Sequence, residues 1–126
     1  MKTKSGSAGG FTLTEMMIVV AVVGLLASLA VPSMAKARDT ARLNTIYSNL
    51  RQLDQAKAEW ALQTHQPDGA PVDDISVLAG FFRDGGLHDV MDETYIPNAV
   101  GTPPEADLPS GVRLGQFGPG AAITAP

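Results

Sequence analysis

The sequence predicts an α+β fold in which one long N-terminal α-helix carries a small, loop-rich C-terminal head with a short helix and a β-hairpin. Three observations predict it. An apolar run fills much of the first third of the chain, an amphipathic helical pattern continues to residue 64, and 17 of the 22 Gly and Pro residues fall in residues 65–126. We divide the chain into a short basic leader (1–10), a membrane-spanning helix (11–32), an amphipathic helix (33–64) and an acidic head (65–126).

Composition excludes several classes of function. The formal net charge is −4, and residues 65–126 hold nine acidic but only two basic side chains. No basic stripe is large enough to neutralise a run of phosphates, so we expect no direct nucleic-acid partner. Cys is absent, which removes disulfides, thiolate metal ligands and a thiol nucleophile. With no nucleophile elbow either, we expect no enzyme activity and no cofactor.

The apolar run is long enough to cross a membrane. Residues 16–31 carry no charge, and Ser28 is their only polar residue. Counted from Phe11, the run has 21 residues and is interrupted only by Glu15. A helix of that length spans roughly 30 Å, the thickness of a bilayer's hydrocarbon core. Lys2 and Lys4 predict that the N-terminus stays in the cytoplasm and that the remainder lies outside.

Two ordinary interpretations leave Glu15 unexplained. A secretory signal would use Lys2 and Lys4 as its basic region and would be cut near residues 27–30 or 35–37, but its apolar region should not open with a carboxylate. A plain single-pass anchor has the same difficulty, because a charge inside a spanning helix costs about 2.5–3.5 kcal/mol.

A third interpretation gives the carboxylate a partner. If a peptidase cuts between Gly10 and Phe11, the new α-amino group of Phe11 is a cation four residues before Glu15. In an assembly of parallel helices, this amine can meet the Glu15 of a displaced neighbour. The two charges would then largely cancel and fix the axial register between subunits.

The residues around this site resemble a known signature. The string Gly10-Phe11-Thr12-Leu13-Thr14-Glu15 follows a Lys-containing leader and precedes an apolar stretch that ends at Pro32. This pattern is similar to the N-terminus of type IV pilins and of type II secretion pseudopilins. The resemblance implies that Gly10 precedes the cleavage site, that Phe11 becomes the N-methylated first residue, and that Glu15 registers the subunits.

The resemblance also implies partners and a location. The partners are like subunits in a helical filament, a prepilin peptidase and methyltransferase, and an inner-membrane platform protein with its assembly ATPase. The precursor would lie in the bacterial inner membrane, and the filament would be periplasmic or extracellular. Pilus and pseudopilus remain alternatives, as do a shaft and a tip position. The competing class is a membrane-tethered periplasmic binding module that does not polymerise.

A helical pattern predicts one helix from about Thr12 to about Thr64. Pro32, together with Gly24, should interrupt it, because Pro lacks the donor N–H and Gly lowers helix propensity. In lipid an intact or gently kinked helix is favoured, whereas in a filament the stretch from Gly24 to Pro32 should be extended. Beyond Pro32, apolar side chains recur on one face of the helix, and we expect this face to pack against the head. The alternative, a path of stacked aromatic rings along a filament, is disfavoured. The face includes Tyr47, Leu50, Leu53 and Trp60.

The acidic tail predicts little regular structure. Asp73 or Asp74 should cap a short helix through Ile75 to Phe82, stopped by Gly85-Gly86. Residues 94–100 and 112–117 should form a hairpin joined by the loop 101–111, and residues 118–126 should fray.

No metal site is expected in this tail. The resemblance implies that calcium could bind an acidic cluster of four side chains. The spacing of these side chains does not match that of an oxygen-ligand loop, so we favour a solvated loop. His65 and His88 are too far apart in sequence to indicate zinc. The cluster comprises Asp84, Asp89, Asp92 and Glu93.

Overall fold

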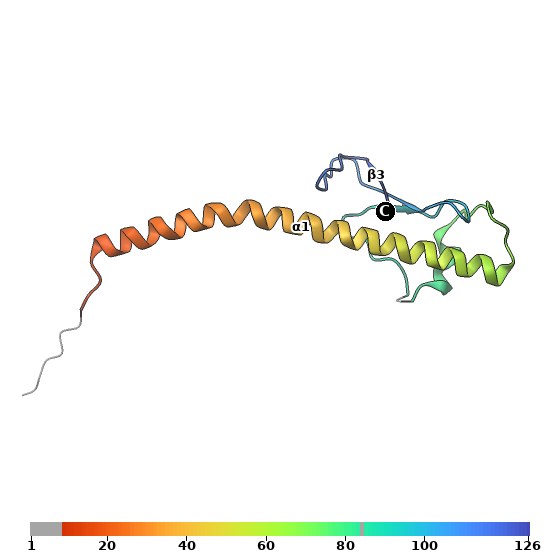
Figure 1. The fold of residues 1–126 in the computed structure, drawn as a ribbon, viewed down its shortest axis with the longest axis horizontal. Helices are drawn as coiled ribbons and strands as arrows, with labels where there is room; N and C mark the ends of the chain where they lie inside the picture. The colour runs from red at the N-terminus through yellow and green to blue at the C-terminus, as the bar shows by residue number, and fades with distance from the viewer. Residues whose placement is uncertain (1–8, 84) are drawn as a thin grey trace, which may run out of the picture. The chain divides into compact units, whose positions relative to one another are not determined.

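The computed structural model describes residues 9–83 and 85–126 and confirms the predicted fold class (Figure 1). Residues 1–35 and 36–126 form two compact units. The first unit holds the beginning of the long helix, and the second holds the rest of that helix with the head. The elements are helix α1 (Leu13–Thr64), the 3-10 helix η1 (Ile75–Phe81) and strands β1 (Thr94–Ile96), β2 (Glu105–Asp107) and β3 (Ala122–Thr124).

Helix α1 contains Pro32 and is helical on both sides of it. Helix α1 is therefore continuous through Gly24 and Pro32 in the single chain, without the interruption that the sequence predicts there. Unwinding within a filament stays a prediction. The helix ends at Thr64. The next residue, His65, has a φ of 56° in the left-handed region, and the Gln66 N–H donates to the Ala61 carbonyl at 2.9 Å.

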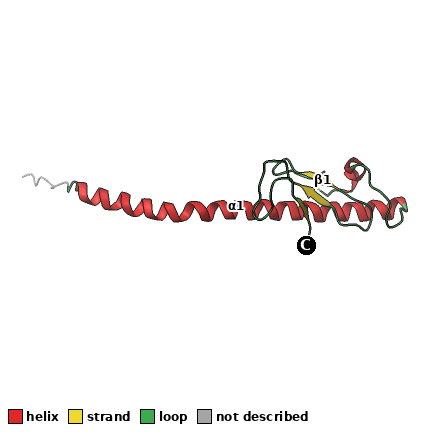
Figure 2. Cartoon of the chain, turned by 90° about the horizontal axis from the view of Figure 1, so that it is seen from above, coloured by secondary structure: helices red, strands yellow, loops and turns green. Residues whose placement is uncertain are grey.

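One face of the second half of α1 forms the core of the head. Leu50 and Leu53 are fully buried, and Tyr47 and Trp60 are half-buried at the edges of the same face. In Figure 2 the strands and loops of the head lie along this part of the helix. Two apolar clusters result, one centred on Leu53 and η1 and one centred on Ile46, Leu50 and the sheet.

The sheet is antiparallel with the order β1-β2-β3. Tyr95 of β1 pairs with Ala106 of β2, and Ala106 pairs with Ile123 of β3. Ala106 and Ile123 are fully buried and pack into the cluster with Ile46 and Leu50. The small Ala side chain lets the middle strand approach the helix closely, so packing on α1 holds strands of only three residues together.

The predicted hairpin is partly wrong. The first strand is present but shorter than residues 94–100, and its partner is β2, which lies inside the predicted loop 101–111. The second predicted strand, residues 112–117, instead contains a tight turn: Gly115 has a φ of 57°, and Leu114 and Phe117 form an isolated bridge. Residues 118–126 were expected to fray, but they contain β3, which Ile123 anchors in the core.

The short helix is confirmed, although it is a 3-10 helix. Asp74 is its N-cap and accepts a hydrogen bond from the Ser76 N–H at 3.0 Å. Leu78 is its fully buried residue and packs into the cluster around Leu53. This contact joins η1 to the apolar face of α1.

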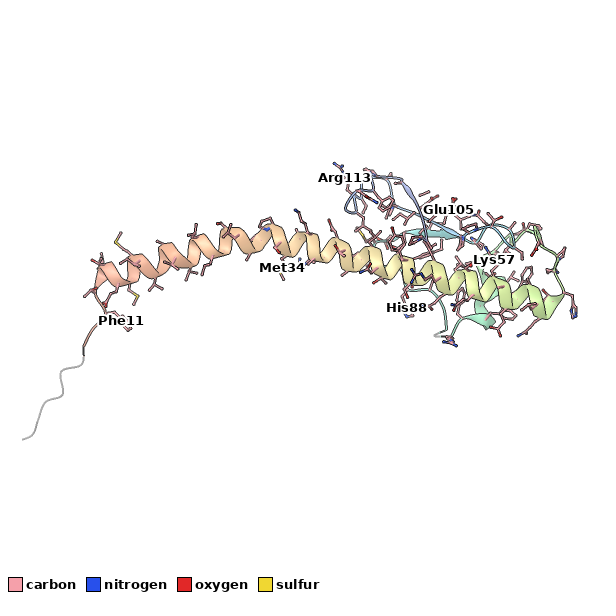
Figure 3. The ribbon with its side chains drawn as sticks, in the orientation of Figure 1. Phe11, Met34, Lys57, His88, Glu105 and Arg113 are labelled. Atoms are coloured by element: carbon pink, nitrogen blue, oxygen red, sulfur yellow. The ribbon has the colours of Figure 1, made fainter. Side chains whose placement is uncertain are left out.

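A buried lysine joins α1 to the loop between β1 and β2. Lys57 is 1% exposed, and its ammonium donates to the Pro97 carbonyl at 2.9 Å and to the Thr102 carbonyl. Asp54, one turn earlier, lies 3.5 Å away. Burial lowers the pKa of Lys57, and the Asp54 carboxylate opposes that shift. Lys57 lies on the head side of α1 in Figure 3. The cation satisfies two loop carbonyls and so fixes the loop on the helix.

The variant Lys57→Met should destabilise the head by about 3 kcal/mol, because it leaves the Pro97 and Thr102 carbonyls without their charged donor. Urea unfolding of the detergent-solubilised full chain, followed by the fluorescence of Trp60, measures this change. Arg51→Met is the matched control, because Arg51 is exposed on the same helix, and it should shift the unfolding free energy by about 0.5 kcal/mol or less. Equal stability of both variants would contradict the role of Lys57.

Candidate functional site

The start of α1 places Glu15 in a capping box with Thr12. The Thr12 N–H donates to Glu15 Oε2 at 2.9 Å, and the Thr12 hydroxyl donates to the same oxygen at 2.8 Å. In return, the Glu15 N–H donates to Thr12 Oγ1 at 3.2 Å. Such reciprocal bonds satisfy backbone N–H groups that the first turn of a helix leaves without partners. Because both bonds to the carboxylate use Oε2, Oε1 remains able to accept from a further donor.

The apolar side chains that follow Glu15 are exposed. Residues 13–34 form the first six turns of α1, and their large apolar side chains project from the helix on all sides (Figure 3). Within the described residues, α1 is the one helix that is long and apolar enough to cross a membrane, by length and composition. Gly24 and Pro32 both lie in this exposed segment. A surface of this size in a small protein indicates a membrane or a protein partner.

The predicted cleavage site lies just before the helix. Gly10 and Phe11 are exposed and belong to no helix or strand, and the Phe11 side chain is 81% exposed. The peptide bond between them is therefore accessible to a peptidase, and Gly10 places no side chain in the way. Lys2 and Lys4 lie outside the described residues.

Comparison with known proteins first defines the class of the N-terminal segment. The prokaryotic N-terminal methylation motif matches residues 6–31. The resemblance of this segment to type IV pilins and type II secretion pseudopilins is thereby confirmed.

Particular relatives come from both groups. The chain is 42% identical over 48 residues to the type IV major pilin protein PilA of Myxococcus xanthus, which covers 38% of this chain and 22% of that protein. It is 40% identical over 50 residues to the type II secretion system core protein G of Klebsiella michiganensis, covering 40% of this chain and 35% of the relative. The Escherichia coli core protein G is 36% identical over 56 residues, covering 44% and 39%.

These likenesses cover only part of each protein. The chain spans between 22% and 39% of the length of these relatives. No solved structure gives a significant match. The head is therefore interpreted from its own contacts.

One carboxylate of the acidic cluster in the head, Glu93, has a structural role. Glu93 is only 6% exposed, and it accepts hydrogen bonds from the N–H groups of Val90 (3.0 Å) and Met91 (2.7 Å) and from the Tyr95 hydroxyl (2.7 Å). Asn49 of α1 donates to that hydroxyl and to the His88 carbonyl, both at 2.8 Å. Glu93 thus holds the loop to the helix.

The remaining acids of this cluster are on the surface. Asp89 and Asp92 are exposed, and Asp84 lies outside the described residues. Within residues 9–83 and 85–126, no group of three or more His, Asp or Glu side chains is arranged to hold a metal ion. His65, just after α1, and His88, between η1 and β1, are both exposed.

Two functional features escaped the sequence interpretation. The pairing of Thr12 with Glu15 was not expected, although the spacing Thr-x-x-Glu before an apolar run is the known pattern of a capping box. The hydrogen-bonded set of Asn49, Glu93 and Tyr95 has no such pattern, because Asn49 is more than 40 residues before the other two.

Acid should destabilise the head through Glu93. Burial pushes the pKa of this carboxyl upward, but the hydrogen bonds from Tyr95, Met91 and Val90 outweigh it and hold the pKa below its ordinary value of 4.5. A carboxyl with a lower pKa in the folded than in the unfolded state stabilises the fold above the unfolded pKa. That stabilisation is lost as pH falls through the folded pKa.

The variant Glu93→Gln should lower the unfolding free energy by about 2 kcal/mol at pH 7, and the difference from wild type should shrink below about pH 4. Urea unfolding of the full chain at pH 7, 5 and 3.5, read from Trp60 fluorescence, measures both effects. Glu59→Gln is the control, since Glu59 is exposed on α1 and should change little at any pH. A loss that stays constant across this range would be inconsistent with the proposed ionised state of Glu93.

Proposed function

We propose that this chain is a structural subunit of a type IV filament, either a pilus or a type II secretion pseudopilus. The precursor is cleaved after Gly10, N-methylated at Phe11 and polymerised through its N-terminal helix. The observation that carries this proposal is a carboxylate, Glu15, held at the first turn of an otherwise uncharged, largely apolar and exposed helical segment. The match to the N-terminal methylation motif over residues 6–31 supports it.

Glu15 sets the register between subunits in this proposal. A helix rises about 1.5 Å per residue. The proposal places Phe11 and Thr12, which precede α1 in the single chain, on the same axis at that rise in the filament, so the α-amine of Phe11 is about 6 Å before Glu15. A parallel copy displaced by that length brings its amine to the carboxylate, where Oε1 accepts while Oε2 keeps its bonds from Thr12. Either charge alone would be costly among apolar helices, and pairing offsets much of that cost.

The apolar segment serves in two environments. Before assembly it spans the inner membrane with the N-terminus in the cytoplasm, and after assembly it packs against other copies. A prepilin peptidase and methyltransferase would process it, and an inner-membrane platform protein with an ATPase would drive extraction from lipid. The role is structural, without enzyme activity or cofactor.

The backbone between Gly24 and Pro32 is proposed to unwind on assembly. In lipid the helix must satisfy its own backbone groups, whereas packed neighbours exclude lipid and offer other contacts. Pro32 removes one helical hydrogen bond in advance, and Gly24 lowers the helix propensity of this stretch. Continuous helix through residues 24–32 in a filament map would overturn this step.

Removing the charge of Glu15 should stop assembly without stopping membrane insertion. Glu15→Gln keeps an acceptor for Thr12 but cannot form an ion pair, and it should reduce sheared surface filaments at least tenfold, as should Glu15→Leu. Glu59→Gln, the same change on an exposed residue later in α1, should leave the yield unchanged. Normal filaments from Glu15→Leu would refute the registration mechanism and favour the membrane-tethered binding module.

Intact mass spectrometry of sheared surface material tests processing directly. The proposal expects a chain that begins at Phe11 and carries one added methyl group. An uncut chain, or one beginning near Ala37, would overturn the assignment and favour a plain anchor or a secretory signal.

A further inference from the structure

Residues 36–126 carry two charged surfaces that form no ion pair among the residues that the structure describes. Lys36, Arg38 and Arg42 are exposed on α1, just beyond the apolar segment, and we call them the basic band. Asp39 lies among them but is half-buried. Within the part of the chain that the structure describes, the ion pair present is that of Lys57 with Asp54, which involves none of the band.

The second surface is residues 88–92, which we call the acidic loop. Its Asp89 and Asp92 side chains are exposed. The loop is held in place from below, because Asn49 of α1 donates to the His88 carbonyl and the buried Glu93 binds the N–H groups of residues 90 and 91. His88 lies beside α1 in Figure 3. Met91 packs against the apolar cluster that contains Ile46. The acidic loop is therefore fixed at the level of residues 46–50 of α1.

We propose that the acidic loop of one copy docks on the basic band of a second copy. This inference rests on the proposed function and names the contact that accompanies registration by Glu15. Each copy offers one band and one loop at different places, so the contact is head-to-tail. A contact of this kind repeats along a filament instead of closing into a dimer.

The register of the N-terminal pair supports this contact. Copies in a helical filament are related by one operation, so any residue is displaced along the axis by the same length as its equivalent. Pairing of Phe11 with Glu15 fixes that displacement at about four residues, or about 6 Å. The acidic loop, at the level of residues 46–50, then meets the level of residues 42–46 in the next copy. Arg42 lies at that level, and Arg38 lies one turn nearer the N-terminus. Unwinding between Gly24 and Pro32 leaves this relation unchanged, because it alters every copy equally.

A second copy fits the band better than a lipid surface does. Anionic headgroups would pair the band but would repel the acidic loop, and the head around it has nine acidic and two basic side chains. A second copy satisfies both surfaces at once. Complementary charges of this kind direct orientation as well as adding affinity.

Cross-linking tests the contact, because the chain contains no Cys of its own. Arg42→Cys and Asp89→Cys are made in separate copies that are expressed together, so a mixed disulfide can form only between two molecules. Asp89 is used because Asp92 has a φ of 57°, where a Cys would be strained. Sheared filaments should yield the linked pair of peptides by mass spectrometry. Arg42→Cys with Asp73→Cys, an exposed residue before η1, is the matched control and should not link.

Charge exchange provides the second measurement. Arg38→Glu with Arg42→Glu, and separately Asp89→Arg with Asp92→Arg, should each lower filament yield at least about fivefold. An exposed ion pair changes an association constant by up to roughly fivefold, and each variant replaces two attractions with repulsions. Combining all four changes should restore the yield to within about twofold of wild type. Cleavage after Gly10 is measured in every variant to establish membrane insertion.

The outcomes separate this inference from the proposed function. Filaments of methylated chains that show no cross-link and no effect of charge exchange would overturn the docking contact alone. If only the basic-band variant is impaired, and it also binds anionic vesicles less, the band serves lipid and the inference is wrong. If wild type gives neither filaments nor a chain starting at Phe11, the proposed function fails.

Discussion

The apolar surface at the start of α1 is the constraint on which the rest of the structure depends. About six helical turns carry large side chains on every side, and none of the residues that the structure describes covers them. The hydrophobic effect makes such a surface unstable in water, so it must lie in lipid or against other apolar helices. Glu15, held in the capping box with Thr12, is the one charged side chain of this segment and can therefore specify its position among apolar neighbours.

The head solves a different problem, that of holding about 60 residues together without disulfides. Its strands are three residues long and would not persist alone. Packing on Leu50 and Leu53 supplies apolar burial, and polar side chains of α1 hold the loops on either side of β1. Lys57 binds one loop and Asn49 another, so the helix serves both as core and as scaffold.

How far the sequence predicted this structure depends on the element. Helix α1 and η1 were predictable because a regular apolar spacing and the capping residue Asp74 are local signals. Strands β2 and β3 were not, since Glu-Ala-Asp and Ala-Ile-Thr are strands only through burial of Ala106 and Ile123 on the helix. Residues 112–117 looked more strand-like, but Gly115 bends them into a turn.

The polar residues singled out by the structure also differ in whether the sequence predicted them. Glu15 stood out because a charge inside an apolar run is costly, and the sequence places it four residues after Phe11, where the resemblance to pilins implies cleavage. The burial of Lys57 had no such signal, because lysine is ordinarily exposed and the carbonyls that it binds are about 40 residues away.

The position of the capping box bears on the cleavage proposed between Gly10 and Phe11. Both of its members, Thr12 and Glu15, lie after the Gly10–Phe11 bond, and the backbone N–H that it uses belongs to Thr12. Cutting that bond removes neither partner. In the proposed maturation, cleavage would replace the leader, with its Lys2 and Lys4, by a single α-amine at Phe11, and both members of the capping box would remain in the mature subunit.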